Sequence, residues 1–329
     1  MEVSEIQNSS SSLIGSGAQW GESRRAHWNG FSYEWRALGS ESNKTIVLVH
    51  GFGASSSHWR HIAPLLASEG FKVYAIDLIG FGNSEQPHPK KIAKLDNEFW
   101  SMQLKDFLDK IVQSNSNRKV TLIGNSLGSL VSITTQAHHG DIVESVIASP
   151  LPDPALVNKA NNFNNKQSKI ISLIKDVSIN VFFKILPLEI LLPIISRSFL
   201  IKIGLQAAYV KSIKSDLELQ KIVSTPAKRK TAARALRAMC IGMALRRKEI
   251  TAPQLLYQIA ANISQPKILL IWGREDKFVP LLIGERLVKQ HPWLKLKVFD
   301  NNGHCPHDES PALFNKNVLE WLEISSINA

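Results

Sequence analysis

The stretch KVTLIGNSLGSLVSITTQA, residues 119–137, decides the fold. It passes from a short apolar segment of strand type directly into a helical pattern, and the turn between them carries a complete G-x-S-x-G motif at residues 124–128. In this motif the serine sits on a strained strand-to-helix turn, and small neighbours let other backbone approach closely. We therefore predict that Ser126 is a nucleophile rather than an ordinary helix-capping serine.

Short apolar runs of strand length recur on both sides of this motif. They lie near residues 45–51, 72–78, 143–149, 266–273 and 294–300. An earlier hairpin is indicated by Asn29-Gly30, a pair that tolerates the positive φ angles of a tight type I′ turn. Unbroken Val, Ile and Leu runs suit strands buried on both faces, and the helical patterns between them predict a mostly parallel sheet.

The alternation of strand and helix stops between residues 151 and 262. Part of this region is strongly apolar, yet Lys184, Glu189 and two prolines interrupt its best window for a membrane span, which needs about 20 largely uncharged residues. We predict helices laid over the sheet instead. The expected division of the chain is a flexible polar arm over 1–26, a core over 27–150, a helical cap over 151–262 and the rest of the core over 263–329.

Positive charge is concentrated in this inserted region. Between Arg197 and Lys248 there are thirteen Lys and Arg residues against two acids, and this excess matches the net charge of +11 of the whole chain. A solvated helix face is the plain interpretation. We also hypothesise that the run AKRKTAARALRAM, residues 227–239, contacts an anionic membrane. Nucleic-acid binding is not expected, because no docking motif or aromatic stacking pattern accompanies the charge.

The cysteines and the N-terminus indicate the compartment. Cys240 and Cys305 form no CxxC pair and no spacing that would frame a disulfide scaffold or a metal site. The first residues lack the basic start and apolar core of a secretory signal. We expect a cytoplasmic protein, with peripheral membrane contact as an open alternative, and no resident metal or cofactor. The sequence does not indicate an oligomeric state.

A nucleophilic serine requires a general base, and the base requires an anion that fixes its tautomer. In the chain order serine, acid, histidine, Asp276 follows the predicted strand 266–273 and His304 follows the next strand. Asp153 and Glu275 are alternative acids. We expect His307, three residues after His304, to brace or cap the closing helix with its acidic neighbours rather than to act as the base.

An oxyanion hole requires two backbone N–H groups. One is expected from Leu127, the residue after the nucleophile. The other is expected from Phe52 in the loop HGFG, residues 50–53, which follows the strand 45–51. His50 and Asp77 are expected to fix loops, and Cys305 to be a small packed side chain.

With these pieces in order, the chain resembles the α/β-hydrolase family over residues 28–326. The resemblance rests on HGFG, DLIGFGNS, GNSLGS, GREDKFVP and GHCPHDES. It implies an α/β fold with a mostly parallel eight-stranded sheet flanked by helices, and an inserted helical cap. One departure is Ser129, where relatives usually have a second glycine, so crowding at the turn is the question it raises.

More narrowly, GNSLG, GRED and GHCPHDE resemble the pheophytinase group of plants and related cyanobacterial hydrolases, which split the phytol ester of chlorophyll derivatives. This resemblance implies a cofactor-independent serine esterase with a lipophilic ester substrate. Trp59, Phe182 and Phe183 are the expected substrate contacts, although cap side chains such as these two phenylalanines can equally pack on one another. Hydrolases of carbon–carbon bonds in ring-cleavage dienoates share similar motifs and remain an alternative, as does a non-catalytic binding module.

Overall fold

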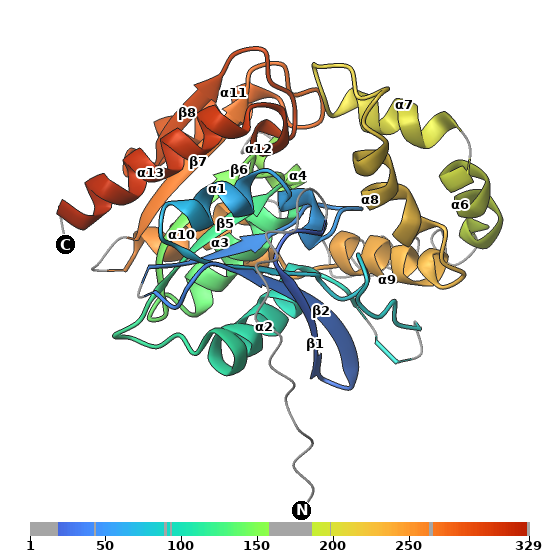
Figure 1. Cartoon of the computed structure of the whole chain (residues 1–329), viewed down its shortest axis with the longest axis horizontal. Coiled ribbons are helices and arrows are strands. Elements are labelled where there is room, and N and C mark those ends of the chain that lie inside the picture. The colour runs from blue at the N-terminus through green and yellow to red at the C-terminus, as the bar shows by residue number, and fades with distance from the viewer. Residues whose placement is uncertain are drawn as a thin grey trace, which may run out of the picture.

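The computed structural model describes residues 19–42, 44–88, 91–92, 94–157, 186–197, 199–262 and 266–327. Its centre is an eight-stranded sheet in the order β1-β2-β4-β3-β5-β6-β7-β8 (Figure 1). The strands are β1 Glu22–Trp28, β2 Phe31–Leu38, β3 Thr45–Val49, β4 Lys72–Ile76, β5 Val120–Asn125, β6 Val143–Ser149, β7 Lys267–Gly273 and β8 Lys295–Phe299. Only the pairs β1/β2 and β2/β4 are antiparallel within this sheet. The predicted mostly parallel sheet is therefore confirmed.

The predicted hairpin joins β1 to β2. Asn29 and Gly30 have φ angles of 50° and 76°, and Trp28 lies opposite Phe31 in the register. However, β1 begins at Glu22, inside the range 1–26 that was predicted to be a flexible arm. That boundary was wrong because Trp20, just before the strand, is fully buried and its indole N–H donates to the Ser56 carbonyl at 3.1 Å.

Helices cover both faces of the sheet. On one face lie α1 (Ile62–Ser68) and α13 (Pro311–Ile327), whose apolar side chains join one buried cluster with the strands. On the other face lie α2 (Asn97–Phe107), α3 (Leu127–His138), α10 (Ala252–Ala260) and α11 (Leu281–Gln290), which form the larger cluster. The shorter elements are η2 Ser56–Trp59, η3 Leu108–Val112, α4 Pro154–Val157, η4 Lys248–Ile250 and α12 Pro306–Glu309.

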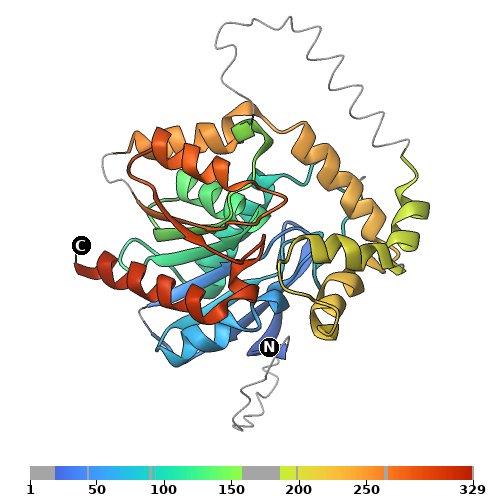
Figure 2. The ribbon, with the colours of Figure 1, turned by 90° about the horizontal axis from the view of Figure 1, so that it is seen from above.

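Four further helices lie beyond the carboxyl ends of the parallel strands. They are α6 Leu188–Arg197, α7 Phe199–Ala207, α8 Leu217–Ala227 and α9 Ala232–Ala244, drawn in yellow-green to gold to one side of the sheet in Figure 2. They fall within the predicted cap range 151–262. The end of that range was wrong, because α10 packs on α3 and buries Leu255, Leu256 and Ile259 in the core.

No helix in the described ranges combines the length and the apolar character needed to cross a membrane.

Candidate active site

Ser126 occupies a strained turn between β5 and α3. Its φ and ψ angles are 53° and −117°, a backbone conformation that is costly for a residue other than glycine. The turn is held because its N–H donates to the Ser149 carbonyl at 3.0 Å. A methyl group on Gly128 would lie 2.0 Å from the carbonyl oxygen of Val49, so the close approach of α3 to β3 requires glycine there.

Ser129 fits the same turn without crowding it. Its side chain is fully buried, and its hydroxyl donates to the Gly124 carbonyl and accepts from the Ser149 N–H, both at 2.8 Å. A serine in place of the usual glycine therefore adds a hydrogen-bonded brace behind the nucleophile.

Asp276 and His304 form a hydrogen-bonded pair at the ends of β7 and β8. The Nδ1 of His304 lies 2.9 Å from Oδ2 of Asp276. The other oxygen, Oδ1, accepts from the backbone N–H groups of Phe278 at 2.8 Å and Val279 at 3.0 Å. Because two fixed donors hold Oδ1, the carboxylate presents Oδ2 to the imidazole, and the histidine takes the tautomer with hydrogen on Nδ1.

The alternative acids have other partners. Asp153 pairs with Arg246 and accepts from the Ala252 N–H at the start of α10, at 2.7 Å. Glu275 accepts from the Asn302 N–H at 3.0 Å. The carboxylate in contact with His304 is therefore Asp276.

Three contacts hold the His304 backbone. Its N–H donates to the Ala208 carbonyl at 2.7 Å, and its own carbonyl accepts from the Asn125 side-chain amide at 3.1 Å. The preceding Gly303 N–H donates to Glu309 at 2.6 Å. The histidine loop is thus tied both to the turn beside Ser126 and to the segment that follows α7.

Glu309 was not singled out as a separate positioning group by sequence reasoning, which grouped it with His307 and Asp308 as turn braces. Its other oxygen accepts from the backbone N–H groups of Val210 at 2.7 Å and Lys211 at 3.2 Å. Burial raises the pKa of this carboxyl group, although the three N–H donors oppose the shift. Its position six residues after a glycine gives no sequence signal for these contacts.

The loop HGFG lies against the nucleophile turn. A methyl group on Gly51 would meet Oδ1 of Asn125 at 2.6 Å and Cβ of Ser126 at 3.3 Å. The Leu127 N–H is the first of α3, where helix N–H groups have no carbonyl partner within the helix. The loop thus contacts the serine turn through Gly51, the residue before Phe52, and Leu127 follows the serine directly. The oxyanion role of the Phe52 and Leu127 N–H groups stays a prediction.

The His50 side chain connects this loop to the chain that follows β4. Its Nε2 accepts from the Leu78 N–H at 3.0 Å, and its Nδ1 lies 2.8 Å from the Gly51 carbonyl. Since burial lowers the pKa of His50, the neutral ring is a fixed connector. Asp77 similarly accepts from the N–H groups of Ser56 and Asn83, at 2.6 and 2.8 Å. Both residues fix loops, as predicted.

Ser126 and His304 open onto one cavity of about 690 Å³. Its walls come from the strand ends and from α7, α8 and α9, and they are mostly apolar. They include Leu200, Leu205, Val223, Leu236 and Met239. No Lys or Arg is among the described residues that line it.

None of the three expected substrate contacts is among the described residues that line this cavity. Trp59 is fully buried and packs on the ring of His307, with centroids 4.4 Å apart, so it belongs to the core and the prediction was wrong. Its place in the short helix η2, which turns it inward, was not visible in the sequence. Phe182 and Phe183 lie outside the described residues. Phe52 and Phe278 do line the cavity, and Phe278 also packs edge-on against His304, with ring centroids 5.3 Å apart.

Behind the site lies a buried polar cluster. The rings of His307 and His58 pack edge to face, with centroids 4.6 Å apart, and burial lowers the pKa of His58 to about 4. Neither ring nitrogen of His307 has a hydrogen-bond partner among the described residues. His307 is therefore an aromatic core residue rather than a helix cap. Burial also raises the pKa of the Cys305 thiol well above its usual value, which suits a packed, unreactive side chain.

Asp308 connects this cluster to a charged junction. It accepts from the Tyr209 hydroxyl at 3.0 Å and pairs with Arg60, which also pairs with Asp216 and Glu218 at the start of α8.

Among the described residues, no group of three or more His, Cys, Asp or Glu side chains is arranged to hold a metal ion.

The chain is similar to known hydrolases over most of its length. Over 85% of its length, the chain is 24% identical to the 2-hydroxy-6-oxononadienedioate/2-hydroxy-6-oxononatrienedioate hydrolase of Cupriavidus pinatubonensis, covering 86% of that protein. It is 23% identical to the pimeloyl-[acyl-carrier protein] methyl ester esterase of Vibrio cholerae, over 87% of this chain and 96% of that protein.

Solved structures share the fold. A thermophilic esterase from Thermogutta terrifontis superimposes with a TM-score of 0.65 and 18% identity, over 93% of this chain and 99% of that one. The family model described as "Alpha/beta hydrolase family" matches residues 46–317, which contain the serine turn, the aspartate and the histidine. The chain belongs to the alpha/beta hydrolase family.

Proposed function

We propose that this hydrolase is a cofactor-independent serine esterase that cleaves a carboxylic ester of a lipophilic substrate. The observation that carries the proposal is the meeting of three elements at one apolar cavity: the strained Ser126, the His304–Asp276 pair at 2.9 Å, and the HGFG loop. A serine at this turn requires a neighbouring base with an anion behind it, and these residues supply both.

The proposed reaction follows from these groups. The Ser126 hydroxyl attacks the ester carbonyl carbon while Nε2 of His304 takes its proton, and Asp276 stabilises the imidazolium that forms. The N–H groups of Phe52 and Leu127 would stabilise the oxyanion. His304 then returns the proton to the leaving alcohol, and water hydrolyses the acyl-enzyme by the same steps in reverse.

The second candidate is hydrolysis of a carbon–carbon bond in a ring-cleavage dienoate, since relatives carry such names. Those names denote dicarboxylates. A buried carboxylate needs a cationic or hydrogen-bonding partner. The described lining of this cavity contains no Lys or Arg, and the side chains of its Gln86, Asn125 and Tyr209 already donate to other protein groups. The apolar lining therefore favours a neutral ester, of which the phytyl ester of a chlorophyll derivative is the specific case we propose to test.

Fluorophosphonate labelling tests the serine mechanism directly. We expect the probe to modify Ser126 in folded protein and to leave Ser126→Ala unmodified. Absence of labelling in both proteins would favour a non-catalytic binding module, and equal labelling of both would place the reactive nucleophile at another residue; either result would reject the mechanism.

A substrate panel tests the specificity. It contains pheophytin, chlorophyll, short p-nitrophenyl esters and a ring-cleavage dienoate, with Ser126→Ala as the control. Turnover of short esters with no turnover of either phytyl ester would exclude the pigment substrate while keeping the esterase. Preferential turnover of the dienoate would instead favour the carbon–carbon hydrolase.

We also propose that residues 227–239 contact an anionic membrane, and the structure limits which of their basic side chains are free to do so. Arg237 pairs with Glu189 and donates to the Leu186 carbonyl, so it is already neutralised. Lys230 is exposed. Vesicle flotation with Lys230→Glu and Arg234→Glu tests the contact, and equal binding to neutral and anionic vesicles would contradict it.

A further inference from the structure

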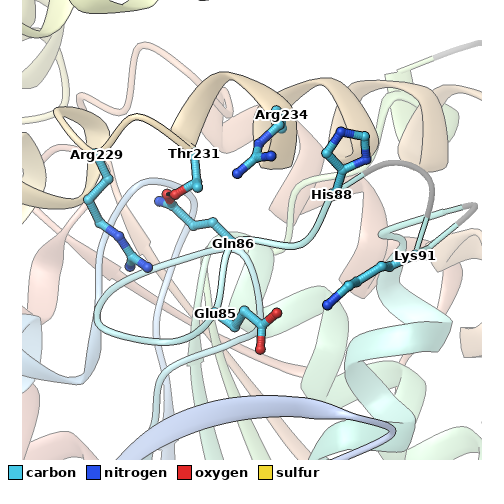
Figure 3. A pocket seen from close by; sticks show the side chains of 7 residues that line it. All are labelled: Glu85, Gln86, His88, Lys91, Arg229, Thr231 and Arg234. Atoms are coloured by element: carbon cyan, nitrogen blue, oxygen red, sulfur yellow. Dashed lines mark hydrogen bonds between the residues drawn. The ribbon is translucent and has the colours of Figure 1, made fainter.

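A second pocket, of about 520 Å³, lies outside the catalytic cavity (Figure 3). Arg234 reaches it from the start of α9, and Arg229 from the turn before that helix. Glu85 and Lys91 reach it from the chain between β4 and α2. Figure 3 shows Arg229, Arg234 and Lys91 on three sides of this pocket, with Gln86 between the two arginines and Glu85 on the side away from Arg234. Three cations therefore share one concave site with one carboxylate.

Arg229 is held in place by the backbone. One terminal nitrogen, Nη1, donates to the carbonyl oxygens of Gly82 and Ser84, each at 2.9 Å. Burial lowers the pKa of its guanidinium group, and the charge of nearby Arg25 acts in the same direction, while the carboxylates of Asp77 and Glu85 oppose the shift without forming an ion pair with it. Because backbone carbonyls carry no full charge, they orient this guanidinium group without neutralising it. A fixed, partly desolvated cation is suited to bind an anion.

Arg234 and Lys91 are not neutralised either. Within the described ranges, no carboxylate forms an ion pair with Lys91, Arg229 or Arg234. The Nε of Arg234 is shielded from solvent and has no hydrogen-bond partner among those residues. Such a buried donor costs free energy unless a ligand or water accepts its hydrogen. Glu85 offsets one of the three positive charges, so the pocket retains an excess of two.

A single wall separates this pocket from the catalytic cavity. Gln86 is buried and lines both spaces. Its side-chain oxygen accepts from the Thr231 hydroxyl at 2.5 Å, and its nitrogen donates to the Pro226 carbonyl at 3.1 Å. The pocket is therefore built onto the wall between α8 and α9 that also faces the cavity.

We propose that this pocket is a binding site for a phosphate group, with Arg234, Arg229 and Lys91 as its ligands. A phosphomonoester carries a charge of roughly −1.5 to −2 at neutral pH, which matches the excess of two positive charges. Its tetrahedral oxygens can accept from the unused guanidinium N–H groups and from the ammonium group together. The group can belong to a soluble phosphomonoester or to a lipid headgroup. Binding does not depend on the proposed esterase activity.

Calorimetric titration with inorganic phosphate tests the site. We expect saturable binding to the wild-type protein and about tenfold or greater weakening in Arg234→Gln, because a hydrogen bond to a charged group is lost. Lys91→Gln is the second variant, since it lies in a loop and leaves α9 intact. The matched control is Lys230→Gln, which removes the same charge from an exposed side chain of the same segment and should retain binding.

Two vesicle compositions distinguish the sources. If vesicles of phosphatidylcholine with phosphatidic acid retain the protein, neutral vesicles do not, and Arg234→Gln abolishes retention while Lys230→Gln does not, the phosphate is that of a headgroup held in the pocket. Saturable phosphate binding without vesicle retention assigns a soluble phosphomonoester. The proposal is overturned if phosphate does not bind saturably, or if Lys230→Gln weakens binding as much as Arg234→Gln. Fluorophosphonate labelling should be unchanged in all three variants, which separates this test from that of the esterase.

Discussion

Replacement of Glu309 by glutamine tests how the histidine loop is positioned. The carboxylate accepts from Gly303 on one oxygen, at 2.6 Å, and from Val210 and Lys211 on the other, at 2.7 and 3.2 Å. Glutamine has one acceptor oxygen and one amide nitrogen that only donates. Whichever way the amide is oriented, its nitrogen faces at least one backbone N–H group.

The expected loss of stability follows from the backbone N–H group that loses its acceptor. A buried donor left unsatisfied costs roughly 1–3 kcal/mol, so we expect Glu309→Gln to lower the free energy of unfolding by about that amount. If the side-chain oxygen stays with Val210 and Lys211, the unsatisfied group is the Gly303 N–H, directly before His304. The imidazole then loses part of its fixed position, and we expect kcat to fall by about tenfold while KM changes little, because small misplacements of a catalytic group slow the chemical step.

Urea unfolding and steady-state hydrolysis of a short ester are the two measurements. The control is Glu285→Gln, the same change at an exposed glutamate on α11. If Glu309→Gln unfolds at the wild-type urea concentration and turns over at the wild-type rate, then the three N–H contacts do not hold the histidine loop and the reasoning fails.

Three other changes test separate parts of the site. Asp276→Asn should lower kcat by about 10³–10⁴-fold with the fold intact, because the amide no longer fixes the His304 tautomer; circular dichroism and ester hydrolysis check it, and a loss below tenfold would contradict the pairing. Burial lowers the pKa of His307 well below its usual value, so below about pH 6.5 the unfolded chain binds more protons and stability falls with falling pH. His307→Phe should therefore keep turnover and lose less stability than wild type between neutral and mildly acidic pH in urea unfolding, and an unchanged pH dependence would argue against it. Gly128→Ala places a methyl group 2.0 Å from the Val49 carbonyl, so fluorophosphonate labelling should be lost or soluble protein should disappear; normal labelling would show that the turn is looser than described.

Much of the fold and site was accessible from the sequence because the signals are local. The strand before Ser126, the glycines around it and the order of Ser126, Asp276 and His304 all lie within short stretches whose spacing the fold constrains. The tight turn at Asn29-Gly30 is local in the same sense. The contact between His304 and Asp276, 28 residues apart, followed from the meeting of strand ends at one edge of a parallel sheet.

The errors arose where packing between distant segments decides the outcome. Trp59 reads as an aromatic residue beside the HGFG loop, yet it is buried against His307. Glu309 reads as a residue of a charged turn, yet its partners at 210 and 211 are about a hundred residues away. Helix α10 has the pattern of any amphipathic helix, and nothing local indicates that it packs on α3. Side-chain direction and partner choice across such distances are tertiary properties.

The junction between α8 and the core indicates which side of the cavity is fixed. The Arg60 side chain is 3% exposed and pairs with Asp216 and Glu218 on one side and Asp308 on the other. Asp308 is as buried as Arg60, whereas Asp216 and Glu218 are partly exposed, so solvent screens the two pairs with α8. Since α8 is held in this way, it cannot separate from the core without breaking these pairs. On α6 and α7, by contrast, Ile190, Leu200 and Ile203 are 65%, 47% and 55% exposed. Of these three side chains, Leu200 lines the cavity. Under the proposed esterase function, a lipophilic substrate would therefore approach across α6 and α7 while α8 stays paired with the core.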